Sequence, residues 1–185
     1  MANKIMLVVF VLCALLFWNN TKKEKAENQS QGITSSDTYE IQRIFSSVVN
    51  KQGKPVAKHN MEKRGYIMVY YSASWCPPCR QFTPVLNKYY LENRVKKNFD
   101  VLLVGADRSE KAMLSYMSHM SFNAIAFDKI ASSGLHNYAA RSIPNLTVFD
   151  YSGKVVVDGR ELSAYKALDA FKKLPVLAGG SGYVR

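Results

Sequence analysis

The chain has 185 residues, of which 48% are hydrophobic and 12% aromatic. This length fits one compact domain with a terminal extension, and the aromatic content excludes a chain that is disordered throughout. Three cysteines form at most one intramolecular disulfide, which excludes a small scaffold held together by disulfides.

The formal net charge is +11. The lysines and arginines are scattered singly or in pairs, with acidic residues among them, and no nucleic-acid-binding motif is present. We therefore expect a basic, solvated surface and no nucleic-acid partner.

The chain begins with an export signature. An unbroken apolar run covers Ile5–Trp18. Its length matches a signal-peptide core of about 7–15 residues, whereas a transmembrane helix needs about 20. No small-residue cleavage site follows, and Cys13 comes after a leucine, which makes it a poor lipoprotein acceptor. Residues 1–18 are predicted to be a signal peptide or an uncleaved signal-anchor, which places the rest of the chain outside the cytoplasm (periplasmic, secreted or membrane-anchored).

Three further segments follow this leader. Residues 19–36 are polar and lack periodicity, so they are predicted to be a flexible spacer. The pattern is globular over residues 37–175, which we expect to form one domain. Pro175 should end the last helix, and the glycine-rich residues 176–185 are predicted to be a loose tail.

The first half of the domain predicts a strand followed by a helix. The residues before it fit either a helix, from the spacing of Ile41, Ile44, Phe45 and Val48, or a hairpin that turns at Gln52–Gly53. Gly65–Ser72 is typical of a strand buried on both faces. A helix kinked by Pro84 is predicted from Pro77 onward, and its apolar residues are Phe82, Val85, Leu86, Tyr89 and Leu91.

The second half predicts more strands and helices. Asp100–Ala106 is a second buried strand, and Asp107 is predicted to be the acidic N-cap of the next helix, with Glu110 as its third helical residue. The remaining predicted elements are an extended segment at 124–127, a helical stretch near 132–140, a hairpin of strands 145–150 and 154–158, and an amphipathic helix over Glu161–Leu174. This order predicts an α/β fold with a central mixed sheet flanked by helices.

The chemistry is concentrated in two cysteines where the first buried strand gives way to its helix. Two intervening residues allow the sulfurs of Cys76 and Cys79 to reach disulfide distance. A helix N-terminus stabilises a thiolate and lowers the pKa of Cys76 from about 8.5, which makes it a nucleophile. Cys79, one turn later, is placed to resolve a mixed disulfide. Pro77 and Pro78 suit the first helical turn, and Arg80 adds a positive charge.

Other interpretations of the two cysteines are weaker. A structural disulfide needs no strand–helix junction. A zinc half-site needs two more ligands, but there is no second pair of this spacing and His59, His119 and His136 are scattered. A lone nucleophilic cysteine would not need Cys79. The sequence favours a redox dithiol that requires neither a metal nor an organic cofactor.

The segment Ser72–Pro84, SASWCPPCRQFTP, resembles the active-site segment of thioredoxin-fold proteins. It is closest to the tryparedoxin and nucleoredoxin branch and is similar to the exported TlpA/ResA-like thiol–disulfide oxidoreductases. Residues 142–144, Ser-Ile-Pro, resemble the second signature of the family. The resemblance covers residues 45–175 and implies a thioredoxin fold.

The resemblance also implies roles for individual residues. Cys76 would attack and Cys79 would resolve, with Trp75 as a lid beside the disulfide. Pro144 would be cis and face the disulfide, and the backbone of Ile143 would pair with an extended substrate segment.

One position departs from the family pattern. Thioredoxins proper have a buried aspartate six residues before the first cysteine, and this chain has Tyr70 there. The proton acceptor for Cys79 therefore stays open, with water and Asp107 as unsupported candidates.

These inferences predict an exported, monomeric enzyme that reduces protein disulfides and is recharged by a soluble or membrane-bound thiol donor. A disulfide oxidase or isomerase that uses the same site stays open. A membrane-tethered binding module with vestigial cysteines is the alternative from another class, and a thiol peroxidase is disfavoured because no threonine precedes Cys76 at the expected spacing.

Overall fold

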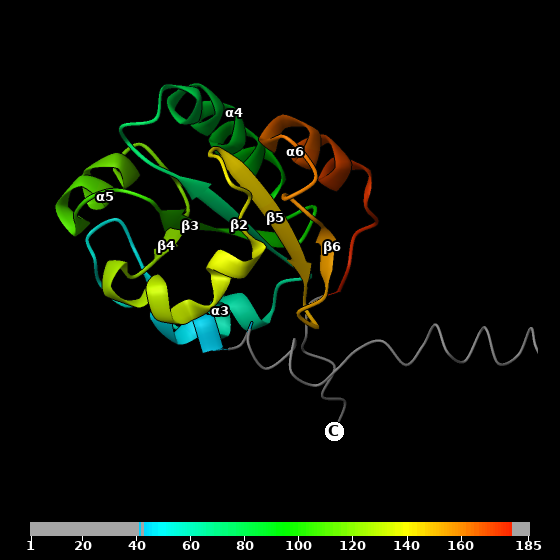
Figure 1. The fold of residues 1–185 in the computed structure, drawn as a ribbon. Helices are drawn as coiled ribbons and strands as arrows, with labels where there is room; N and C mark the ends of the chain where they lie inside the picture. Colours follow the sequence, from blue (N-terminus) through cyan, green and yellow to red (C-terminus); the bar gives the residue numbers. More distant parts are fainter. Residues whose placement is uncertain (1–40, 42, 179–185) are drawn as a thin grey trace, which may run out of the picture. The chain divides into compact units, whose positions relative to one another are not determined.

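A six-stranded mixed sheet forms the centre of the domain (Figure 1), with strand order β1-β4-β3-β2-β5-β6. The computed structural model describes residue 41 and residues 43–178. The predicted leader, the spacer and the end of the tail lie outside these residues. Within the described part of the chain, no helix is both long and apolar enough to cross a membrane.

Two parallel strands, β2 (Tyr66–Ser72) and β3 (Phe99–Gly105), lie at the middle of the sheet, and every residue in them is buried. This confirms the prediction of strands covered on both faces. On one side, β5 (Asn145–Asp150) pairs antiparallel with β2 and forms the predicted hairpin with β6 (Val155–Val157). On the other side, β4 (Asn123–Ile125) runs parallel to β3, and the short β1 (Val48–Val49) closes the edge.

Alternate residues of the central strands face two separate cores. Met68 and Tyr70 of β2 belong to the core that packs against α4 (Pro77–Asn93), α5 (Glu110–Met117) and α6 (Ala164–Lys173). Val69 and Tyr71 belong to the opposite core, which contains residues of the N-terminal turn, of α3 (His59–Glu62) and of a 3-10 turn at Leu135–Tyr138. Helices therefore cover both faces, and the fold is a thioredoxin fold, as predicted.

Both interpretations of the N-terminal residues are partly correct. Arg43 and Ile44 are helical and continue into a 3-10 turn at Phe45–Ser47. The chain then enters β1 and turns back at Gly53, whose φ of 72° favours glycine, so that Val49 pairs with Pro55.

The predicted helical stretch near 132–140 consists of two 3-10 turns, Ala131–Ser133 and Leu135–Tyr138, which Gly134 with φ 73° separates. The last helix begins at Ala164, with Ser163 as its N-cap, and not at Glu161.

The predicted apolar face of α4 is partly wrong. Val85 is 43% and Leu91 is 59% exposed. The predicted Phe82 and Leu86 are buried, and Tyr90 continues their face at the same interval of four residues. The helix also continues through Pro84.

The cap of α5 differs from the prediction as well. Ser109 is the N-cap, and its hydroxyl accepts a hydrogen bond from the Ala112 N–H. Asp107, which was predicted for this role, is buried, and its carboxylate binds Ser74 instead.

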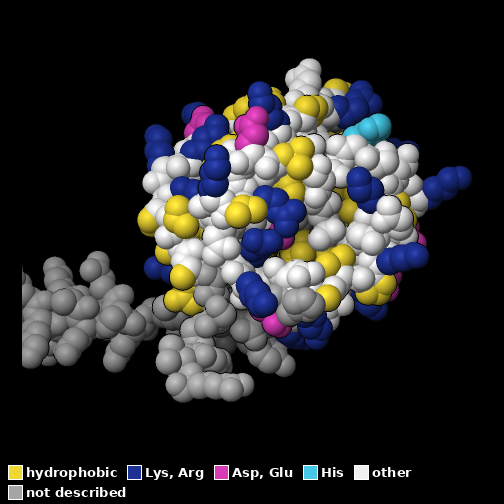
Figure 2. Space-filling model, turned by 180° about the vertical axis from the view of Figure 1, so that it is seen from behind, with side chains coloured by type: hydrophobic (Ala, Val, Ile, Leu, Met, Phe, Trp, Pro, Cys, Tyr) yellow, Lys and Arg dark blue, Asp and Glu magenta, His cyan; other side chains and the backbone are white. Residues whose placement is uncertain are grey.

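Lysine and arginine side chains are scattered over the face of the domain that Figure 2 draws, with few acidic side chains between them. This distribution agrees with the expectation of a solvated basic surface.

Candidate active site

The two cysteines lie at the start of α4, directly after the loop that leaves β2. Cys76 is the N-cap of the helix with an extended backbone, and Pro77 and Pro78 occupy the first helical turn, where the missing N–H groups cost little. Cys76 and Cys79 are joined by a disulfide with their Cα atoms 5.2 Å apart. The predicted pair is therefore brought together.

The surroundings of the two sulfurs differ. Cys79 is completely buried, and Cys76 keeps 4% of its surface exposed at the N-terminal end of the helix, beside Trp75, which is 55% exposed. The N–H of Cys79 donates to the Cys76 sulfur at 3.2 Å. A donor N–H and a helix N-terminus both favour negative charge, and both are directed at the Cys76 sulfur.

Trp75 and Arg80 are held beside the cysteines by backbone carbonyls. The indole N–H of Trp75 donates to the carbonyl of Ala106 at 2.9 Å, which fixes the ring against the loop after β3. The guanidinium of Arg80 donates to the carbonyl of Ser74 at 3.3 Å. Both side chains lie where the sequence places them, and their catalytic roles stay predictions.

The loop before β5 faces the disulfide. The Ile143–Pro144 peptide bond is cis, as the resemblance implies, and the carbonyl oxygen of Ile143 lies 3.7 Å from the Cys76 sulfur. Asn145 fixes this loop, because its side chain accepts from the Ala140 N–H at 3.1 Å and donates to the Gly159 carbonyl. Sequence reasoning missed Asn145, because no motif marks its pairing with Ala140 and Gly159.

Comparisons with known proteins agree with this geometry. Residues 65–155, which contain the cysteine pair and the cis-proline loop, match a family model described as thioredoxin-like. The chain contains a thioredoxin-like domain. This domain is similar to the nucleoredoxins and tryparedoxins.

The relatives of this thioredoxin-like domain include two curated proteins. Nucleoredoxin of Xenopus laevis is 36% identical over 115 residues, which is 60% of this chain and 27% of that protein. Tryparedoxin of Trypanosoma brucei brucei is 41% identical over 83 residues, which is 43% of this chain and 57% of that protein. The chain thus matches about a quarter of the nucleoredoxin and little more than half of the tryparedoxin.

Solved structures extend the match. Tryparedoxin II from C. fasciculata has 28% identity and a TM-score of 0.63, and the match covers 75% of this chain and 93% of that one. A tryparedoxin II structure in complex with glutathionylspermidine has 29% identity and a TM-score of 0.60, and the match covers 70% of this chain and 91% of that one.

Behind Cys79, the thioredoxin-like domain contains a ring of four buried hydroxyl groups. The hydroxyl of Tyr70 lies 2.8 Å from that of Thr83, which lies 2.6 Å from that of Tyr116. Ser72 closes the ring with hydrogen bonds to Tyr70 at 2.9 Å and to Tyr116 at 3.0 Å. The Thr83 hydroxyl also lies 2.8 Å from the Cys79 carbonyl, so the ring touches the backbone of the resolving cysteine.

This ring fills the place of the buried aspartate of thioredoxins proper. Burial raises the pKa of Tyr70 well above 10.0, so its phenol stays protonated at neutral pH. The sequence showed that Tyr70 occupies this position but not that three further hydroxyl groups gather around it.

Buried tyrosines predict a loss of stability at alkaline pH. Burial raises the pKa of Tyr70, Tyr71 and Tyr90 in the folded chain above their ordinary value of 10.0. Above about pH 10, these tyrosines ionise in the unfolded chain but stay protonated in the folded chain. The free energy of unfolding therefore keeps its full value below about pH 10 and decreases as the pH rises further.

Urea unfolding of the oxidised chain measures this loss, since Cys76 and Cys79 then do not titrate. The unfolding midpoint should be lower at about pH 11 than at about pH 8. Equal midpoints, or native phenolate absorbance equal to that of the unfolded chain at the higher pH, would show that these tyrosines ionise freely in the fold.

Asp107 lies next to the cysteine segment. One carboxylate oxygen accepts from the N–H of Ser74 at 3.0 Å and from its hydroxyl at 2.6 Å. The other is buried and has no hydrogen-bond partner among the described residues. Asp107 thus fixes the loop before Trp75.

In the described part of the chain, no group of three or more His, Cys, Asp or Glu residues is placed to hold a metal ion.

Proposed function

We propose that this protein is an exported thiol–disulfide oxidoreductase that reduces protein disulfides through Cys76 and Cys79. The observation that carries the proposal is the asymmetry of the pair, in which a helix-capping Cys76 lies beside the cis-proline loop and a fully buried Cys79 lies one turn behind it.

The reaction proceeds in two exchanges. The Cys76 thiolate attacks one sulfur of a substrate disulfide, so that a mixed disulfide forms and the other substrate sulfur leaves as a thiolate that takes up a proton. Cys79 then loses its proton and attacks the Cys76 sulfur, which releases the second substrate sulfur. That sulfur also leaves as a thiolate and takes up a proton. Counting the proton that Cys76 released on forming its thiolate, the substrate gains two electrons and two protons, and the Cys76–Cys79 pair loses them.

A small cleft beside Cys76 supports a peptide substrate. It has a volume of about 270 Å³, and its lining includes Pro78, Ile143, Pro144 and Tyr165. Tyr165 is 49% exposed and packs edge-on against the buried Phe82. An extended substrate strand in this cleft would pair with the backbone of Ile143 and present its disulfide to Cys76.

Insulin reduction tests the activity. With dithiothreitol as the thiol donor, the full chain should shorten the lag before the insulin B chain precipitates, in proportion to the amount of protein added. A lag equal to that with dithiothreitol alone would show that the pair catalyses no disulfide reduction and would favour a binding module.

The reduction potential of the pair decides the direction of electron flow. A value near about −270 mV, as in thioredoxin, would support a reductase that depends on a thiol donor. A value between about −180 and −120 mV would support the alternative of an oxidase or isomerase.

The proposed location rests on residues 5–18, whose apolar run has the length of a signal-peptide core. Membrane attachment through these residues and a monomeric state belong to the same proposal. Fractionation of cells that express the full chain tests the location, and recovery of the protein from the cytosol would contradict export.

A further inference from the structure

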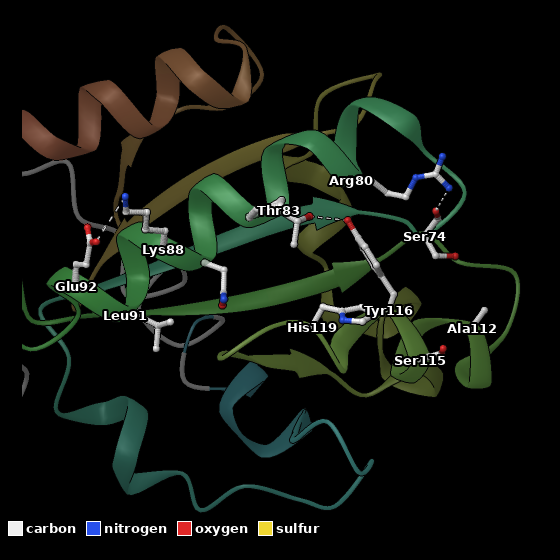
Figure 3. A pocket seen from close by; sticks show the side chains of 12 residues that line it. Ser74, Arg80, Thr83, Lys88, Leu91, Glu92, Ala112, Ser115, Tyr116 and His119 are labelled. Atoms are coloured by element: carbon white, nitrogen blue, oxygen red, sulfur yellow. Dashed lines mark hydrogen bonds and ion pairs between the residues drawn. The ribbon is translucent and has the colours of Figure 1, made fainter.

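Helix α4 has a second, larger hollow on a different face from the cleft beside the cis-proline. This groove lies between α4 and α5, with a volume of about 990 Å³ against about 270 Å³ for the cleft at Ile143. The two hollows share no lining residue. Figure 3 shows side chains of α4 along one wall of the groove and those of α5 and His119 along the other.

Basic side chains outnumber acidic ones in the lining of the groove. Arg80, Lys88 and His119 contribute basic groups, and all three are exposed. The amide oxygen of Asn87 accepts from the Ser121 N–H at 2.7 Å, which leaves the NH₂ group of Asn87 as a donor. Glu92 is the one carboxylate among the lining residues, and its oxygen lies 4.0 Å from the Lys88 ammonium. The lining is therefore complementary to an acidic ligand.

The length and apolar content of the groove favour a peptide over a small anion. The α4 residues of the lining run from Arg80 to Glu92, which at about 1.5 Å per residue is about 18 Å. An extended peptide covers that distance with about five or six residues. Pro84, Leu91 and Ala112 add apolar surface.

The groove ends at the redox site. Ser74 lies at the same end as Arg80, directly before the Trp75–Cys76 segment (Figure 3). Thr83 and Tyr116, which are hydrogen-bonded to each other behind Cys79, also line the groove. A segment bound along α4 would therefore hold the rest of its protein next to the cysteines.

We propose that this groove docks an extended acidic segment, five or six residues long, of a protein that exchanges electrons with the Cys76–Cys79 pair. The binding of an acidic peptide follows from the lining of the groove alone. The redox role of the partner rests on the proposed function.

A labelled hexaglutamate peptide is the probe. Its fluorescence anisotropy should rise on titration with the oxidised full chain, and the rise should weaken with added salt. The double variant Lys88→Glu/His119→Glu should weaken binding about tenfold or more, since it places negative charge in both walls. The matched control is Lys166→Glu/Lys173→Glu, which reverses two exposed lysines of α6 outside the groove and should change binding less than about twofold.

Proton NMR locates the peptide on the unsubstituted chain, and a variant serves only to assign the signals. Hexaglutamate should shift the ring signals of His119, assigned with His119→Gln, and leave those of the exposed His136 unchanged.

Several results would overturn the proposal. The first is that hexaglutamate does not bind. The second is that the α6 control weakens hexaglutamate binding as much as the groove variant does. The others are that hexaglutamate shifts the signals of His136 instead of those of His119, or that hexalysine binds more tightly than hexaglutamate. Tighter binding of a hexathymidylate oligonucleotide would replace the acidic peptide with nucleic acid. These binding measurements need no turnover. Their failure would therefore overturn the docking proposal without affecting the result of the insulin assay.

Discussion

Replacing Cys76 with serine is expected to reduce the rate of insulin reduction to that of dithiothreitol alone. At the helix N-terminus, the Cys76 sulfur accepts a hydrogen bond from the Cys79 N–H, and it lies beside the cis-proline loop. A serine hydroxyl is not ionised near neutral pH and forms no disulfide, so neither exchange occurs. The loss should therefore be complete rather than partial.

Cys13 provides the matched control for this substitution. It is the third cysteine of the chain and lies in the predicted leader. The Cys13→Ser variant should reduce insulin at the rate of the unsubstituted chain. Full activity of Cys76→Ser, or loss of activity in Cys13→Ser, would contradict the assignment of the nucleophile.

Replacing Phe99 with alanine is expected to cost about 3–5 kcal/mol of the free energy of unfolding. Phe99 is fully buried at the start of β3. Its ring packs against those of Tyr89, Tyr90 and Phe171, with the centroid of Phe171 5.0 Å away. Alanine would leave a cavity in the core between the sheet and the helices α4 and α6.

Urea unfolding followed by circular dichroism measures this cost. The Val95→Ala variant is the control, because Val95 is 78% exposed and its truncation should change the free energy of unfolding by less than about 0.5 kcal/mol. Phe99→Leu keeps most of the volume and should lie between the two. An unfolding midpoint of Phe99→Ala equal to that of Val95→Ala would show that this aromatic cluster contributes little.

The central strands and the cysteine motif could be predicted because their signals are local. A continuous β-branched and aromatic run is typical of a strand covered on both faces, and Gly65–Ser72 became β2 within one residue. The cysteines and Pro77–Pro78 specify both a helix start and a dithiol within four residues. Such features need no knowledge of distant parts of the chain.

The errors occur where a distant partner decides the local structure. Asp107 and Ser109 are both good N-cap residues, but Ser74, 33 residues earlier in the chain, binds the carboxylate of Asp107 and leaves the cap to Ser109. Tyr90 is buried in place of Leu91 because it lies four residues after Leu86 on the same helix face, where its hydroxyl also reaches the buried Asp100 at 2.9 Å.

The support behind the cysteines could not be predicted for a related reason. The four hydroxyl groups of the ring come from β2, α4 and α5, and no sequence spacing links Tyr116 to Thr83. Asn145 holds residues on both sides of the cis-proline loop in the same way. Hydroxyl and amide side chains of this kind are common on surfaces, so only the fold identifies these as buried and paired.

Trapping the mixed disulfide tests the central claim most directly. The full-length Cys79→Ser variant, reduced and then mixed with insulin, should form a covalent adduct, because Cys76 still attacks and no resolving thiol follows. Mass spectrometry should find one insulin chain linked to Cys76, and dithiothreitol should release it. If no adduct forms, or if the link is to Cys13, the two-step exchange at Cys76 and Cys79 is wrong.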